Sequence, residues 1–133
     1  MITTSEDAAD LVDRYLQFCE DRDLASASAL WAPGIPRIEF PGPVVYSSLD
    51  ELVAASRAQY AWVRKRRDEY AVATDADGAW TVTSIGRLYG VGLDGADFAD
   101  VRYVDVFTVG GDGIRAQRVW NDLVIAGIVP PVR

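Results

Sequence analysis

The order of its secondary-structure patterns is the feature that most limits the fold of this chain. Helical periodicity fills the first half of the sequence, and long runs of alternating or β-branched residues fill the second half. The strand-like segments cover residues 69–74, 80–91, 98–109 and 114–124, and they are separated by the turn sequences Asp77-Gly78, Asp94-Gly95 and 110–113. Helices followed by such a meander predict an α+β fold, in which the helices cover one face of a curved antiparallel sheet and a pocket is enclosed between them.

Helical segments are expected at three places before the strands. Ser5 is placed to cap a first helix with a broad apolar face over residues 8–19, and Asp23 is placed to cap a shorter second helix. Ser48 begins a capping box, and apolar residues at helical spacing continue from it to the basic cluster of residues 64–67. This spacing predicts a third helix that ends in the basic cluster, where cations complement the helix dipole. Residues 37–41 are expected to be extended.

Composition favours a single domain over residues 1–133, because a chain of 133 residues that is 50% hydrophobic suits one core. No signal peptide and no apolar run long enough for a membrane span are recognised, so a cytoplasmic protein without membrane contact is expected. The net charge of −7 disfavours nucleic-acid partners. Cys19 cannot form an internal disulfide, and the absence of histidine excludes imidazole-based triads and the common zinc sites. No metal and no organic cofactor are expected.

Asp105 is the most unusual candidate site residue. With a period of two, Tyr103, Asp105 and Phe107 share one face of a predicted strand, while Val104 and Val106 point to the other. Both faces look buried, and burial disfavours an ionised carboxylate, so the pKa of Asp105 is expected to lie above the ordinary value of about 3.9. Such an acid is either a structural group satisfied by a neighbouring Tyr or Arg, or a functional one.

Aromatic residues are frequent enough to line a pocket, although a small domain also needs most of them for its core. The candidate substrate-binding residues are Trp31, Phe40, Trp62, Tyr89, Tyr103, Phe107, Trp120 and Asp122.

Several stretches resemble ketosteroid isomerases and the wider NTF2-like and SnoaL-like superfamily. They are Arg14-Tyr15-Leu16, Asp23-Leu24, Ala29-Leu30-Trp31-Ala32, Ile38-Glu39-Phe40, Val104-Asp105-Val106-Phe107 and the Gly-rich turn into Ile114. The resemblance covers nearly the whole chain. It implies a cone-shaped fold with an enclosed pocket, and a homodimer. Within it, Tyr15 matches the oxyanion-hole tyrosine, Asp105 the protonated aspartic acid and Glu39 the general-base aspartate.

The function that this resemblance implies is cofactor-free acid/base chemistry on a small hydrophobic cyclic carbonyl compound. Glu39 removes a proton beside the carbonyl group, and Tyr15 and Asp105 stabilise the enolate, so that the compound is isomerised or cyclised. The residues also allow other roles. Tyr15 can simply pack in the core, and Glu39 can face solvent.

Two other functions stay open. The first is epoxide opening by water that Asp105 or Asp122 activates. Related enzymes place an acid in the last strand, where this chain has Val119, and the nearest polar residues are Asn121 and Asp122. Strand alternation places Asn121 on the face of Val119 and Asp122 on the opposite face, whereas a bulge near Arg118 would alter this assignment. Arg102 is out of phase with Asp105, which disfavours an Asp-Arg-Asp arrangement. The second function is a non-catalytic module that binds a hydrophobic ligand.

Overall fold

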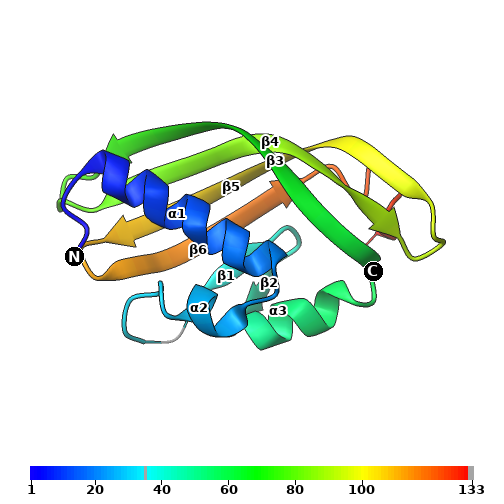
Figure 1. The fold of residues 1–133 in the computed structure, drawn as a ribbon, viewed down its shortest axis with the longest axis horizontal. Coiled ribbons are helices and arrows are strands. Elements are labelled where there is room, and N and C mark those ends of the chain that lie inside the picture. The colour runs from blue at the N-terminus through cyan, green and yellow to red at the C-terminus, as the bar shows by residue number, and fades with distance from the viewer. Residues whose placement is uncertain (35, 132–133) are drawn as a thin grey trace.

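The described residues, 1–34 and 36–131 of this computed structural model, form helices that lie on one face of a curved sheet (Figure 1). The sheet has the strand order β2-β1-β6-β5-β4-β3. The α+β fold class is therefore confirmed. The elements are α1 (Ser5–Glu20), α2 (Leu24–Ser28), β1 (Ile38–Phe40), β2 (Val44–Tyr46), α3 (Leu49–Ser56), β3 (Tyr60–Thr74), β4 (Trp80–Gly92), β5 (Asp97–Gly110) and β6 (Gly113–Asn121).

The long strands β3 to β6 form the predicted antiparallel meander. Gly78 and Gly95 have φ angles of 85° and 80° at the first two turns, and this left-handed conformation explains why glycine follows aspartate at both places. β1 adds to the sheet differently, since it pairs parallel with β6 through Ile38 and Gln117. The extended segment predicted over residues 37–41 corresponds to β1, whereas β2 is not apparent from the sequence.

The third helix is shorter than predicted. Its cap is the expected one, because the Ser48 hydroxyl accepts from the backbone N–H of Glu51 at 3.1 Å. The helix ends at Ser56, however, and the basic cluster of residues 64–67 lies in β3. Pairing of β3 with β4 runs from Tyr60 to Thr74, so ladder hydrogen bonds along a long strand outweigh the local helical spacing.

Helix α1 packs its apolar stripe against the sheet. Its cap is Thr4 and not Ser5, because the Thr4 hydroxyl accepts from the backbone N–H of Asp7 at 3.1 Å and Ser5 is the first helical residue. Tyr15 lies at the centre of the contact, edge-on to Trp31 and Phe107 with ring centroids 6.1 Å and 5.8 Å away. The buried residues of α1 are Ala8, Leu11, Val12, Tyr15 and Leu16.

Two apolar clusters fill the space above the sheet. Phe107 belongs to the larger cluster, under α1, and Tyr103 belongs to the smaller one. Asp105 lies between them on the same inward face of β5, as the alternation of Tyr103, Asp105 and Phe107 predicts. None of the described helices is long and apolar enough to cross a membrane.

Candidate active site

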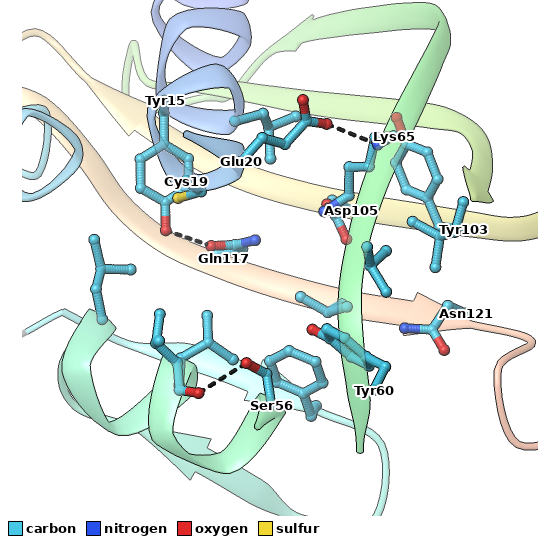
Figure 2. Close-up of a pocket in the computed structure, with 18 of the residues that line it drawn as sticks. Tyr15, Cys19, Glu20, Ser56, Tyr60, Lys65, Tyr103, Asp105, Gln117 and Asn121 are labelled. Carbon is cyan, nitrogen blue, oxygen red and sulfur yellow. Dashed lines mark hydrogen bonds and ion pairs between the residues drawn. The ribbon is translucent and has the colours of Figure 1, made fainter. Parts of the chain in front are cut away.

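A cavity of ≈ 110 Å³ lies between the helices and the inner face of the sheet. Tyr15 and Cys19 reach it from α1, Lys65 from β3, Asp105 from β5 and Gln117 from β6 (Figure 2). Most of the remaining wall is apolar, and examples are Leu16, Leu49, Leu52, Val53, Val63 and Leu88. The cavity is therefore a hydrophobic space into which a few polar groups converge, as small-molecule sites commonly are.

Asp105 is held in this cavity by its position in the sheet. It pairs with Ser84 in β4 and Val119 in β6, and its side chain is 0% exposed. Oδ2 lies 3.2 Å from the Nζ atom of Lys65. This contact is an ion pair, and neither carboxyl oxygen accepts a hydrogen bond from a described residue. The carboxyl is thus charge-compensated but has free acceptor positions.

Burial and charge act in opposite directions on this pair. Burial raises the pKa of Asp105 above its ordinary value, and the attraction of Lys65 only partly offsets this. Burial favours a lower pKa for Lys65, but the attraction of Asp105 outweighs it and the pKa of Lys65 is raised. Lys65 therefore remains an ammonium group, while Asp105 can exchange a proton at a higher pH than an exposed aspartate.

Lys65 reaches the cavity because the basic cluster is part of a strand. Along β3, Lys65 and Arg67 are partly buried whereas Arg64 and Arg66 are exposed. Glu20 at the end of α1 holds this part of β3, since its Oε1 accepts from the backbone N–H of Lys65 at 2.7 Å and lies 3.3 Å from Nη1 of Arg67. In the sequence, Lys65 is recognisable as an inward-facing residue only if residues 63–67 are assumed to form a strand, in which alternate residues face inward.

Tyr15 and Gln117 form the second polar group. The Tyr15 hydroxyl donates to Oε1 of Gln117 over 2.9 Å, and both side chains are buried. Burial raises the pKa of Tyr15 well above its ordinary value, so the hydroxyl keeps its proton. The structure therefore brings Tyr15 and Asp105 to one cavity, as expected, but the Tyr15 hydroxyl already donates its hydrogen bond to Gln117. In the sequence, Gln117 can be assigned to the cavity only because it is two residues before Val119 and therefore on the same face of the strand.

Glu39 does not join this group. On β1, Ile38 is buried and Phe40 lines the cavity, so strand alternation turns Glu39 to the other face. Its Oε1 binds Nη2 of Arg37 at 2.6 Å, its side chain is 33% exposed, and it borders a shallow hollow on the outer face together with Trp120. The expectation that Glu39 faces the same pocket as Tyr15 and Asp105 is corrected by this placement.

The candidate aromatic residues divide into separate groups. Phe40 and Tyr103 line the cavity, whereas Trp31 and Phe107 lie behind Tyr15 in the core. On the outer face, Trp62 and Trp120 are 44% and 46% exposed. Tyr89 packs edge-on to Trp62, and the Arg66 guanidinium lies over the Tyr89 ring. These outer aromatics therefore do not contribute to the cavity.

At the end of β6, alternation separates Asn121 from Asp122 as predicted. Asn121 lines the cavity, while Oδ2 of Asp122 binds Nε of Arg102 at 2.8 Å with the Arg102 side chain largely exposed. The expectation that Asp122 faces the pocket is thus corrected, since Asn121 lines the cavity and Asp122 does not. Within the described part of the chain, no group of three or more Asp, Glu or Cys side chains is placed to hold a metal ion.

Known proteins match this chain in structure. No family model and no curated protein matches the sequence. An NTF2-like protein from Burkholderia thailandensis is 26% identical with a TM-score of 0.69, and the match covers 98% of this chain and 100% of that protein. The chain is an NTF2-like protein in its fold. This confirms the fold that the resemblance of the sequence implies.

Two further structures share the NTF2-like fold. TerC, crystallised with polyporic acid, is 15% identical with a TM-score of 0.73, and the match covers 90% of this chain and 95% of TerC. A candidate polyketide cyclase from Pseudomonas putida is 15% identical with a TM-score of 0.63, and the match covers 92% of this chain and 97% of that protein. At this identity the likeness concerns the fold.

Proposed function

We propose that the protein is a cofactor-free enzyme that moves a proton on a small hydrophobic carbonyl compound through an enolate, as an isomerase or cyclase. The observation that carries this proposal is the Asp105 carboxyl. It is fully buried, it faces an apolar cavity, and its oxygens have free acceptor positions beside the Lys65 ammonium. A perturbed carboxyl that converges with a cation in a cavity is typical of functional sites.

The chemistry requires Asp105 to act first as a base. Its carboxylate takes a proton from the carbon beside the substrate carbonyl, and the electron pair of the broken C–H bond moves into the enolate. The carboxylic acid then returns the proton to a different carbon, which gives an isomer and restores Asp105. In a cyclisation, the enolate carbon instead forms a bond to a second carbonyl carbon, and the proton goes to the new alkoxide. General acid/base help of this kind contributes about 10²–10⁴ in rate.

Lys65 stabilises this reaction through its charge. The ammonium group lies beside Asp105, so it stabilises the negative charge of the carboxylate before proton transfer. It also stabilises the negative charge of the enolate after proton transfer. In this assignment Asp105 is the base. Glu39, the base implied by resemblance, lies on the outer face. The raised pKa of Asp105 makes its carboxylate a stronger base than that of an exposed aspartate.

The similar structures support small-molecule chemistry in this fold. One is described as a candidate polyketide cyclase, and another was crystallised with polyporic acid. Epoxide opening by water is less well supported, because Asp122 is paired with Arg102 outside the cavity.

A panel of cyclic ketones and enones tests the proposal. Double-bond migration and exchange of the protons beside the carbonyl are followed by NMR for the wild type, for Asp105→Asn and for Asp68→Asn. Asp68 is a matched control, since it is an exposed aspartate that is also paired with a cation, Arg87. Activity that falls about a hundredfold or more only in Asp105→Asn is expected. Ligand binding without turnover in the wild type would instead identify a binding module.

A further inference from the structure

One hydrogen bond turns the oxygen end of the Gln117 side chain toward Tyr15. The Tyr15 hydroxyl donates to Oε1 of Gln117 over 2.9 Å, and the Gln117 side chain is buried. Burial holds the pKa of Tyr15 well above its ordinary value, so the hydroxyl is available as a donor at all ordinary pH values. In this orientation the carboxamide presents its acceptor oxygen to Tyr15, and Nε2 points away from the hydroxyl.

The Nε2 end of Gln117 is directed into the cavity. Figure 2 shows the nitrogen on the side away from Tyr15, toward Asp105. In the sheet, Gln117 pairs with Phe107 and Val119 pairs with Asp105, so Gln117 and Asp105 are diagonal neighbours on one face. Among the described residues, the hydrogen bond of the Gln117 side chain is the one that Oε1 accepts from Tyr15. Nε2 is thus an amide donor at the cavity wall without a protein acceptor in the described ranges, and it fits an acceptor on a ligand.

We propose that Gln117 donates the hydrogen bond that holds the substrate carbonyl oxygen, and that Tyr15 acts through Gln117 as a positioning residue. The inference rests on the proposed function, because a carbonyl oxygen at Nε2 places the neighbouring carbon on the side of Asp105. When Asp105 removes the proton, negative charge develops on that oxygen and the bond from Nε2 strengthens. This differs from the role expected from resemblance, in which Tyr15 contacts the substrate itself.

The size and charge of the cavity limit the substrate class. A cavity of about 150 Å³ accommodates benzene, and the volume here is ≈ 110 Å³. The part of a ligand that the cavity encloses is therefore at most one small ring. The charged groups on the wall are Glu20, Arg22, Lys65 and Asp105, so acids and bases balance. A neutral monocyclic ketone or enone fits this environment better than an anion.

The carbonyl stretching frequency of bound cyclohexenone tests this assignment, since a hydrogen bond to the oxygen lowers that frequency. We compare the wild type with Gln117→Met, Tyr15→Phe and the double variant, and Gln117→Leu serves as a second substitution if Gln117→Met does not fold. The wild type is expected to lower the frequency relative to an apolar solvent. Gln117→Met loses this shift and weakens binding about tenfold, and Tyr15→Phe has a smaller effect.

The double variant separates positioning from direct contact. If Tyr15 acts through Gln117, adding Tyr15→Phe to Gln117→Met changes neither the frequency nor the affinity further. A shift that survives in Gln117→Met, or an equal extra loss on adding Tyr15→Phe, overturns the assignment. Absence of cyclohexenone binding to the wild type also overturns it.

Proton exchange in heavy water, measured on the same samples, distinguishes this inference from the proposed function. Exchange without a shift that depends on Gln117 refutes the role of Gln117 and leaves the proton-transfer chemistry in place. A Gln117-dependent shift without exchange refutes the chemistry and leaves Gln117 as the group that binds the carbonyl.

Discussion

Lys65 and Asp105 form an ion pair across a strand that lies between them. Nζ of Lys65 is 3.2 Å from Oδ2 of Asp105, although Lys65 is on β3 and Asp105 on β5, with β4 in the middle of the order β5-β4-β3. Lys65 pairs with Leu88 and Asp105 with Ser84, so the inward β4 residue between these two positions is Gly86. Because Gly86 has no side chain, the long lysine side chain can cross β4 and place its charge in the cavity.

Replacing Lys65 by Met is predicted to move the pH dependence of turnover. Without the ammonium, the pKa of Asp105 rises further, because burial is no longer offset by an opposite charge. The rising limb of the pH–rate profile therefore moves to higher pH. Arg66→Met is the matched control, since Arg66 lies on the same strand but stacks on Tyr89 at the outer face. An unmoved limb in Lys65→Met contradicts the coupling.

Asp105→Asn is predicted to gain stability relative to the wild type as the pH rises. The folded pKa of Asp105 is raised, so its stabilising contribution is complete below the unfolded value of about 3.9 and is lost as the pH rises through the folded pKa. Urea unfolding of both proteins between about pH 4 and pH 8 measures this difference. A difference that stays constant over this range refutes the prediction.

Asp68→Asn provides the control of opposite sign. A hydrogen bond from Arg87 lowers the pKa of Asp68, so its contribution is present above the unfolded pKa and is lost as the pH falls. The stability of Asp68→Asn relative to the wild type is therefore expected to decrease, not increase, with rising pH.

Much of the fold is predictable from local sequence. Turn glycines such as Gly78 mark the hairpins, and Ser48 and Asp23 cap helices as expected, because these signals depend on backbone conformation at one or two residues. Asp105 is recognisable because its neighbours in an unambiguous strand are apolar on both sides.

The rest of the site depends on tertiary pairing. The apolar residues between Ser48 and residue 63 keep a helical spacing in the sequence. The basic cluster that follows is nevertheless part of a strand, because β3 pairs with β4 along its whole length. The face of Glu39 is predicted wrongly for another reason. In a strand as short as β1, a shift of one residue turns each side chain to the other face. The face is set by the parallel pairing of β1 with β6, which are far apart in the sequence.

Glu39→Gln is predicted to leave turnover within about twofold of the wild type. Glu39 is paired with Arg37 on the outer face, and such exposed pairs contribute about 0–1 kcal/mol to stability. Initial rates on the best compound of the panel provide the comparison. A hundredfold loss would restore Glu39 as the base.

Gly86→Ala is predicted to destabilise the protein by about 1–3 kcal/mol, because overpacking forces the backbone to shift. A Cβ atom at Gly86 collides with the backbone oxygen of Arg66 and comes within 2.9 Å of Cε2 of Tyr103, which lines the cavity. Gly111→Ala is the control, because its nearest contact is an ordinary 3.5 Å. Equal urea midpoints for the two variants contradict the prediction.

The central claim is that Asp105 is a buried carboxyl whose pKa is raised and which transfers the proton. The most direct test is an NMR titration of the Asp105 side-chain carboxyl carbon, assigned by its loss in Asp105→Asn. The account predicts a pKa above that of an exposed aspartate, and the same pKa in the rising limb of the pH–rate profile. A carboxyl that titrates at or below the ordinary value of about 3.9 would contradict it.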